Sequence, residues 1–213
     1  MIRSAAHSVL VVFLAGVLIA VEGIDGAGKT TQAKRLVRLL NRMGVRAVYT
    51  REPTGGSIGK LVRRHLSGRK TYSEETVTLL FAADRLDHIQ RFIEPQLKRG
   101  ITIVADRYVH SSIAYQAAAT GMREWVISVN SLARRPDISI FVDVNPREAL
   151  ERLSSRRKYV YERLEFLERV RSEYIRLVES GEMIVVDGSG TRGEVAQRIS
   201  TVVEPLLRER GLI

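Results

Sequence analysis

The sequence Gly23-Ile24-Asp25-Gly26-Ala27-Gly28-Lys29-Thr30-Thr31 contains the complete G-x-x-x-x-G-K-[ST] pattern of a phosphate-binding loop. The apolar run 17–21 before it is typical of a buried strand, and the amphipathic helical pattern after it ends near Gly44. A strand, a glycine-rich loop and a helix in this order direct backbone N–H groups towards one point, where a polyphosphate can bind. Lys29 is predicted to reach the β- and γ-phosphates, and the Thr30 hydroxyl to ligate magnesium.

The rest of the chain alternates short apolar runs with helical patterns. Four further runs are expected as strands, at 47–49, 101–105, 138–142 and 183–186. They are rich in β-branched residues and continuously apolar, which is typical of a parallel sheet covered on both faces. We therefore predict an α/β fold with a doubly wound, five-stranded parallel sheet flanked by helices. In such a sheet, ligands bind at the carboxyl ends of the strands.

Three local patterns predict helix ends and faces. Thr71-x-x-Glu74 resembles a capping box at the start of a helix, and Asn145-Pro146 suits an N-cap followed by the first helical residue. The last apolar stripe is expected to comprise Val195, Ile199, Val202 and Leu206.

Length and composition favour one globular domain. The chain has 213 residues and no cysteine, which excludes disulfides and thiolate metal sites. It has 34 Lys and Arg against 24 Asp and Glu, a net charge of +10. Such a charge suits either nucleic acid or a small, highly anionic substrate. The arginines are spread along the chain without a basic tail, so we expect anionic nucleotides as ligands and no nucleic-acid partner.

The first residues resemble a secretory signal, because Arg3 precedes the apolar run 9–14. The continuous apolar stretch 9–21 is too short for an ordinary membrane span, and its second half is needed as the strand before the phosphate-binding loop. We expect residues 1–16 to be an extension of uncertain role and 17–213 to form a single domain with no membrane partner, located in the cytoplasm. Alternatively, translation begins near Val17.

Charged residues follow two of the predicted strands. Asp106 and Arg107 come after the third, where an acidic residue in a phosphate-loop protein usually helps to hold magnesium and an arginine bridges phosphate oxygens. Arg51 follows the second strand and is either a ligand for a second phosphate or an ordinary surface arginine. Phe81 and Arg85 lie one helical turn apart and could hold a nucleobase, although Phe81 alone is better interpreted as a core residue.

Together these motifs resemble the thymidylate kinase family over residues 17 to about 208. The motifs that carry the resemblance occur in the order Glu22-x-x-Asp25-Gly26-x-Gly28-Lys29-Thr30-Thr31, Arg51-Glu52-Pro53, Phe81-x-x-x-Arg85, Asp106-Arg107-Tyr108 with Ser111-Ser112 and Tyr115-Gln116, Pro136-Asp137 and Val186-Asp187-Gly188. Many ATPases share the phosphate-binding loop. Far more specific to this family are its Glu-x-x-Asp-Gly form, the Asp-Arg-Tyr segment and the Tyr-Gln pair.

The resemblance implies a role for each motif. Residues 23–31 would bind ATP, and Asp25 would lie near the deoxyribose 3′-hydroxyl and the magnesium ion. The acceptor thymidylate (dTMP) would be bound by its phosphate at Arg51 and Arg107. Further implied contacts are Phe81 stacked on thymine, Arg85 bonded to its O4, Ser112 and Ser111 near N3, Tyr115 against the 2′ position, and Gln116 supporting that pocket.

A short helical lid is expected at about residues 152–162. The resemblance implies that lid arginines neutralise charge on the transferred phosphoryl group, and Arg156 and Arg157 are the candidates. Some family members carry this arginine inside the phosphate-binding loop, but here positions 26 and 27 are Gly and Ala, so the lid must supply it. A solvated basic turn is the alternative interpretation.

The implied reaction is Mg²⁺-dependent transfer of a phosphoryl group from ATP to dTMP, giving dTDP for thymidine nucleotide biosynthesis. The catalytic residues would be Lys29, Asp106, Arg107, Arg156 and Arg157, with Thr30, Asp25 and Asp106 around the metal. A homodimer is implied as well. Another deoxynucleotide or deoxynucleoside kinase is the alternative, although a neutral nucleoside needs no phosphate-binding arginines. An NTPase associated with nucleic acid is a third possibility.

Overall fold

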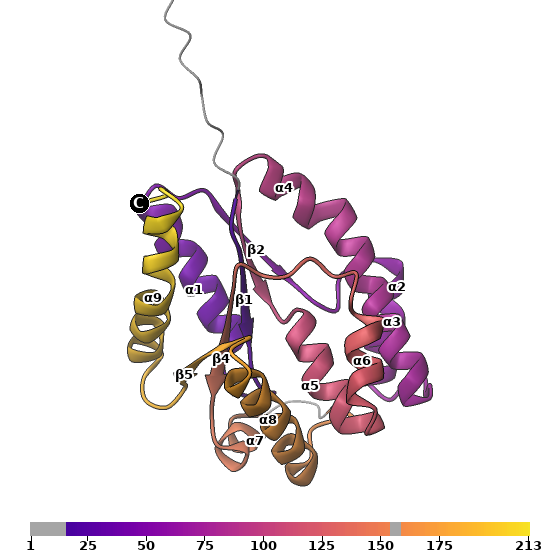
Figure 1. Ribbon diagram of the computed structural model, residues 1–213. Coiled ribbons are helices and arrows are strands. Elements are labelled where there is room, and N and C mark those ends of the chain that lie inside the picture. Colours follow the sequence, from indigo (N-terminus) through magenta and orange to yellow (C-terminus); the bar gives the residue numbers. More distant parts are fainter. Residues whose placement is uncertain (1–15, 154–158) are drawn as a thin grey trace, which may run out of the picture.

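The computed structural model describes residues 16–153 and 159–213, which are organised around one sheet (Figure 1). All five strands are parallel, as predicted, and their order in the sheet is β2-β3-β1-β4-β5. The strands are β1 (Leu18–Glu22), β2 (Ala47–Arg51), β3 (Thr102–Asp106), β4 (Ile138–Asp143) and β5 (Ile184–Asp187). The sheet is doubly wound about the central β1, so its carboxyl edge is the expected ligand-binding edge.

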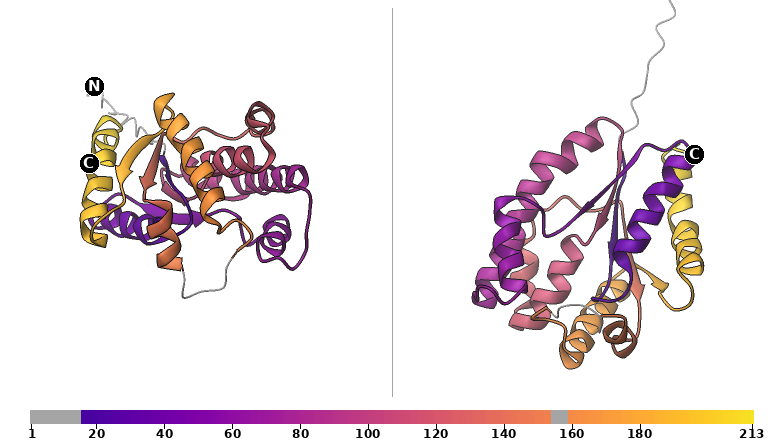
Figure 2. Two further views of the ribbon diagram at one scale, coloured as in Figure 1. Left: turned by 90° about the horizontal axis from the view of Figure 1, so that it is seen from below. Right: turned by 180° about the vertical axis from the view of Figure 1, so that it is seen from behind.

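Helices cover both faces of this sheet. Figure 1 shows α1 and α9 together on one side and α3, α4 and α5 on the other, and the view from behind in Figure 2 agrees. The helices of the described residues are α1 (Lys29–Arg42), α2 (Ser57–Leu66), α3 (Glu74–His88), the π-helical turn η1 (Ile89–Ile93), α4 (Glu94–Lys98), α5 (Val109–Thr120), α6 (Arg123–Val129), α7 (Pro146–Leu153), α8 (Leu164–Glu179) and α9 (Arg192–Glu209).

The alternation of side chains along β1 explains why the core has two parts. Leu18 and Ala20 pack into a cluster with residues of α5 and α8, whereas Ile19 and Val21 pack into a second cluster with residues of α1 and α9. All four side chains are fully buried. A strand covered on both faces must be apolar at every position, which explains the continuous apolar run in the sequence.

The strands extend one or two residues beyond their predicted ends, because polar residues at the carboxyl edge still pair in the parallel ladder. Asp106 pairs with Val21 and Arg51, and Asp143 pairs with Asp187. In consequence β1, β3, β4 and β5 each end in an acidic residue, and Glu52 follows β2 directly. A row of carboxylates therefore lies along the edge where ligands are expected.

Two helix predictions need correction. Ser73 caps α3, since its Oγ accepts the N–H of Thr76 at 3.2 Å; the predicted capping box at Thr71 does not form, because the helix starts at Glu74. The fully buried positions of α9 are Val195, Ile199, Val203 and Leu207, whereas the predicted Val202 and Leu206 are only partly buried at the side of this stripe. Spacings of four residues keep the stripe facing the sheet. The prediction for Asn145-Pro146 is confirmed, since α7 begins at Pro146.

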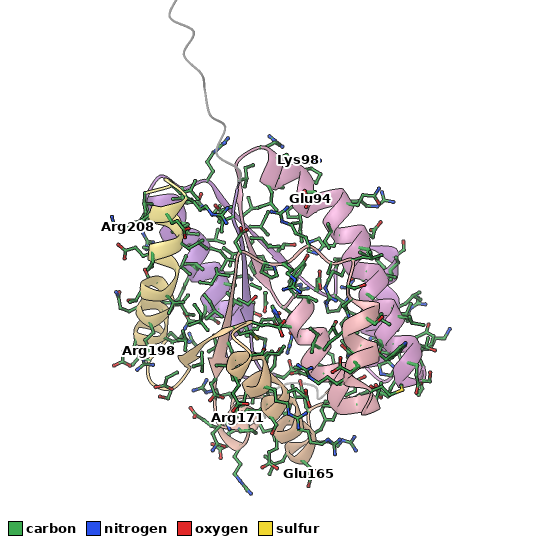
Figure 3. The ribbon with its side chains drawn as sticks, in the orientation of Figure 1. Glu94, Lys98, Glu165, Arg171, Arg198 and Arg208 are labelled. Atoms are coloured by element: carbon green, nitrogen blue, oxygen red, sulfur yellow. The ribbon has the colours of Figure 1, made fainter. Side chains whose placement is uncertain are left out.

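Charged side chains cover the outside of the molecule. In Figure 3, Lys98 on α4, Glu165 on α8 and Arg208 on α9 lie at the outside of the molecule. Arg171 on α8 and Arg198 on α9 instead bond to Asp143 and Asp187, at the ends of β4 and β5. Within residues 16–153 and 159–213, no helix combines the length and the apolar character that crossing a bilayer requires.

The pairing of β4 with β5 supplies a matched test of the core. Ile140 is fully buried and lies in register with Ile184, whose side chain is 46% exposed. We expect Ile140→Ala to lower the free energy of unfolding by about 2–5 kcal/mol, because it leaves a cavity in the second core cluster. Ile184→Ala is expected to cost less than about 1 kcal/mol. Urea denaturation of both variants measures the difference; equal losses would contradict the assignment of the core.

Candidate active site

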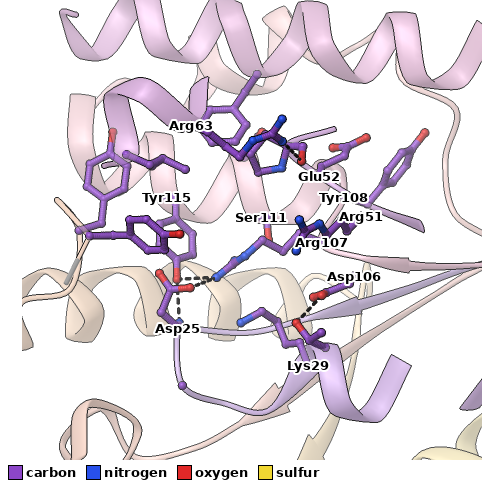
Figure 4. A pocket seen from close by; sticks show the side chains of 18 of the residues that line it. Asp25, Lys29, Arg51, Glu52, Arg63, Asp106, Arg107, Tyr108, Ser111 and Tyr115 are labelled. Carbon is purple, nitrogen blue, oxygen red and sulfur yellow. Dashed lines mark hydrogen bonds and ion pairs between the residues drawn. The ribbon is translucent and has the colours of Figure 1, made fainter. Parts of the chain in front are cut away.

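A cavity of about 500 Å³ opens at the carboxyl edge of the sheet, between the phosphate-binding loop and helices α2, α3 and α5 (Figure 4). Among the described residues, six basic and three acidic side chains line it, so the cavity attracts anions. The basic ones are Lys29, Arg51, Arg63, Arg85, Arg107 and Arg152, and the acidic ones are Asp25, Glu52 and Asp106. Nearly all of the predicted site residues with described positions therefore come together in one place.

The phosphate-binding loop forms the floor of the cavity. Gly26 has φ of 87° and lies so close to α7 that a Cβ atom there would be 2.1 Å from the carbonyl oxygen of Ala149, so only glycine fits. Gly28 has φ of 86° and precedes the first residue of α1. The side chain of Lys29 is buried and its Nζ donates to the carbonyl oxygen of Ile24 at 2.6 Å, which holds the ammonium over the loop.

Thr30 and Asp106 meet beside this loop, as the sequence predicts for a magnesium site. The Oγ1 of Thr30 donates to Oδ2 of Asp106 at 2.5 Å, and the hydroxyl of Tyr49 donates to the same oxygen at 3.0 Å. Burial and the Asp106 carboxylate raise the pKa of Tyr49, so its hydroxyl stays protonated and remains a donor. Hydroxyl and carboxylate oxygens are the ligand types that Mg²⁺ prefers.

Asp25 forms an ion pair with Arg107 rather than contacting Thr30 or Asp106. Its Oδ1 lies 2.5 Å from Nη2 of Arg107, and the backbone N–H of Asp25 donates to the Tyr115 hydroxyl at 2.9 Å. Burial opposes ionisation of Asp25, but Arg107 and Lys29 outweigh it and hold the pKa of this carboxyl below its ordinary value. The guanidinium also lies over the Tyr115 ring, 4.7 Å from its centroid.

Arg85 also lines the cavity and is 1% exposed. Its Nη2 is 2.8 Å from Oε2 of Glu52 and donates to Oγ of Ser112 at 2.9 Å, while Nη1 donates to Asn130. Phe81, half-buried, lines the same region. Gln116 is 1% exposed, and neither its Nε2 nor its Oε1 has a hydrogen-bond partner in the described part of the chain. A buried amide without partners favours a polar ligand beside it.

The structure adds residues that the sequence interpretation did not assign. Arg63 on α2 points into the cavity and its Nη1 donates to the carbonyl oxygens of Pro53 (2.9 Å) and Thr54. Glu52, quoted in the motif but given no role, neutralises Arg85. The sequence of α2 gave no signal for Arg63, since its relation to the cavity depends on how α2 packs against α3.

The structure bears on two further predictions, the role of Ser111 and the helical lid. Ser111 turns its hydroxyl towards Arg107, Glu22 and Tyr174. Arg156 and Arg157 lie outside the described residues, and so does most of the predicted lid. Of its described part, only 152–153 are helical, at the end of α7, whereas 159–163 form a turn and extended chain before α8.

A phosphate-binding loop at the edge of a doubly wound parallel sheet, with a group of arginines lining the same cavity, defines a phosphate-loop kinase with a phosphorylated acceptor. Comparisons with known proteins specify the family. The model of the family described as Thymidylate kinase matches residues 21–199. A probable thymidylate kinase of Pyrobaculum calidifontis is 42% identical over 187 residues, 87% of this chain and 95% of its own length.

Two other relatives agree. A probable thymidylate kinase of Thermococcus onnurineus is 39% identical over 203 residues, 90% of this chain and 99% of the relative. One of Methanococcus vannielii is 45% identical over 161 residues, 76% of this chain and 77% of the relative. The chain belongs to the thymidylate kinase family, and its reaction is the phosphorylation of dTMP to dTDP. The family implies ATP as the phosphoryl donor.

Proposed function

We propose that the cavity at the carboxyl edge of the sheet binds both substrates, with the ATP phosphates on the loop 23–31 and dTMP between Arg107 and Arg85. The observation that carries this proposal is the ion pair between Asp25 and Arg107, because it joins the phosphate-binding loop to the residues facing it. The dTMP phosphate binds to Arg107 and to Arg51, an exposed arginine on the wall of the cavity. Guanidinium groups suit this task because they bind phosphate oxygens in pairs.

The base of dTMP lies at the other end of the cavity. Phe81 stacks on thymine, and Arg85 donates to its O4 while Glu52 balances the buried charge. Ser112 faces the N3 edge, and the buried amide of Gln116 supports the pocket. Because Ser111 bonds to Arg107, it acts on the phosphate side rather than on the base. Tyr115 lies beside Asp25 and crowds the 2′ position, which disfavours ribonucleotides by steric clash.

Thr30 and Asp106 would hold the magnesium ion of this site, and Asp25, which pairs with Arg107, is the third candidate. The donor set fits, since a hydroxyl and a carboxylate meet at 2.5 Å beside the loop. The described residues contain no group of three acidic or histidine side chains that could hold a metal ion without the substrates. Mg²⁺ commonly relies on one or two carboxylates and the substrate phosphates, and when bound it adds positive charge to the phosphates.

Phosphoryl transfer at this site needs no covalent intermediate. An oxygen of the dTMP phosphate attacks the γ-phosphorus of ATP in line, the bond to the β-phosphate oxygen breaks, and ADP leaves. Lys29 neutralises charge on the β- and γ-phosphates, and Arg107 aligns the attacking phosphate. Arg156 and Arg157, which lie outside the described residues, are proposed as the further cations of the lid.

Because the reaction consumes ATP, we propose that the protein works in the cytoplasm.

We propose that the protein is a homodimer, as the family implies. The outer face of α3 carries Leu79 and Leu86, which are seven residues apart and therefore share a face. Their exposed fractions are 53% and 38%. Large apolar side chains in such a row are typical of a protein–protein interface.

Acceptor selectivity tests the proposed function directly. In a coupled assay of ADP release with ATP and Mg²⁺, we expect the highest kcat/KM with dTMP, a lower value with dUMP, and almost none with UMP, because the ribose hydroxyl clashes with Tyr115. Thymidine should not be phosphorylated, since Arg107 and Arg51 then lack their ligand. Activity with thymidine alone would indicate a deoxynucleoside kinase, and ATP hydrolysis indifferent to every acceptor would contradict the acceptor site.

The charge of Lys29 predicts how ATP binding depends on pH. Burial, and next the proximity of Arg107, lower the pKa of Lys29 to about 8. The charged form dominates below this pKa, so affinity for ATP is highest there and falls as the pH rises through it. The negative charge of bound phosphates raises the pKa of Lys29 again. Near pH 8 the protein therefore takes up protons when ATP binds.

Calorimetry in two buffers of different ionisation enthalpy measures this uptake. Lys29→Ala is the control: it should bind ATP weakly and without the proton uptake, and it should lower kcat by orders of magnitude. An ATP affinity that stays constant between about pH 7 and pH 9 would show that Lys29 does not carry the charge on which binding depends.

The oligomeric state tests the proposed interface. Sedimentation analysis should give twice the chain mass of 24.0 kDa for the wild type. Leu79→Glu should give a monomer, because it places a charge in an apolar contact. Met43→Glu is the matched control, since Met43 is 42% exposed at the end of α1, far from α3 in the fold. A wild-type monomer, or a dimer that survives Leu79→Glu, would exclude this interface.

A further inference from the structure

We propose that Glu22 is a positioning residue that holds Arg107 in its working conformation through Ser111, and so sets the affinity for the acceptor phosphate. Glu22 ends β1, is fully buried and does not line the cavity. It therefore acts through other residues rather than on the substrate. The inference rests on the proposed function, in which Arg107 binds the phosphate of dTMP.

All acceptor positions of the Glu22 carboxylate are used inside the protein. Oε1 accepts the backbone N–H groups of Tyr108 at 2.8 Å and of Ser111 at 3.2 Å. Oε2 accepts the hydroxyls of Ser111 at 2.5 Å and of Tyr174 at 3.2 Å. Burial, followed by the Glu22 charge, raises the pKa of Tyr174, so this hydroxyl stays a donor. Four donors converging on one carboxylate fix its position at the start of α5.

These contacts surround the one described non-glycine residue with a positive φ. Arg107 has φ of 70°, a conformation that costs free energy in a residue with a side chain and persists only where neighbours enforce it. The N–H of Arg107 donates to the carbonyl oxygen of Val21 at 3.1 Å, and the next N–H, of Tyr108, donates to Glu22. The end of β1 therefore fixes the backbone on which the Arg107 side chain depends.

Glu22 also acts on the guanidinium itself. The Ser111 hydroxyl donates to Glu22 and accepts from Nη1 of Arg107 at 2.9 Å, so it connects the carboxylate to the cation. Nη1 also donates to the carbonyl oxygen of Gly23 at 3.2 Å. With Asp25 and Tyr115 holding Nη2, both ends of the guanidinium are oriented. Without Glu22, the Ser111 hydroxyl loses the acceptor that directs its lone pair towards Arg107.

The experiment compares two ligands that differ only in the phosphate. Glu22→Gln keeps the shape of the side chain but removes its charge and replaces one acceptor by a donor. We expect the dissociation constant of dTMP to rise about tenfold or more, and the inhibition constant of thymidine to stay within about twofold, because thymidine does not contact Arg107. Ser111→Ala, which cuts the same connection without changing Glu22, should give the same selective loss and serves if Glu22→Gln does not fold.

Two reference variants make the result specific. Ile140→Val, a change in the core that touches none of these groups, lowers stability and should leave the ratio of the dTMP and thymidine constants unchanged. Arg107→Lys should reproduce the selective loss for dTMP. The role of Glu22 is refuted if Arg107→Lys loses affinity for dTMP selectively while Glu22→Gln and Ser111→Ala do not. It is refuted as well if Glu22→Gln and Ser111→Ala weaken the binding of dTMP and thymidine equally. If Arg107→Lys also shows no selective loss, the proposed phosphate site fails, and the role of Glu22 fails with it.

Discussion

The structure depends on one electrostatic constraint: a cavity that binds polyphosphates must hold several buried cations, and each needs a carboxylate nearby. The parallel sheet meets this constraint because acidic residues stand at the carboxyl ends of its strands. Glu22 ends β1, Glu52 follows β2 and Asp106 ends β3. Glu52 contacts Arg85 directly, whereas Glu22 reaches Arg107 through Ser111. Attraction for anions and stability of the cavity therefore come from the same edge of the sheet.

The sequence predicted the fold well because its signals were local. The phosphate-binding loop requires a strand before it and a helix after it, and continuous apolar runs identified strands buried on both faces. Strand ends were placed too early, since Asp106 and Asp143 look like loop residues until their pairing partners are known. The capping box at Thr71 failed because Ser73, next to the helix, competes for the same role. The fully buried residues of α9 differ in part from the predicted stripe, because only the packing of the helix against the sheet determines which of its residues face the core.

The candidate site was predictable where residues lie next to a recognisable motif, and less so where folding brings distant segments together. Asp106 ends a strand that is parallel to the one before the loop, and Arg107 follows it. Their places beside Thr30 and Asp25 of the loop therefore follow from the topology. Arg63 belongs to a helix whose sequence carries no phosphate-binding pattern, and only its position over the cavity reveals it. For Ser111, proximity to the base was expected from the motif, but its hydrogen bonds to Glu22 and Arg107 depend on a buried network without a linear signature.

Arg107 joins the two halves of the cavity. Through Asp25 and the carbonyl oxygen of Gly23 its guanidinium contacts the phosphate-binding loop, and through Ser111 and Tyr115 it contacts α5. In-line transfer requires the donor and acceptor phosphates to be aligned within a fraction of an ångström. Two independent arginines on separate elements would let the two halves shift relative to one another. Arg107 is bonded to both sides and has a constrained backbone with a φ of 70°, so under the proposed function the separation of the two phosphates is set by the fold.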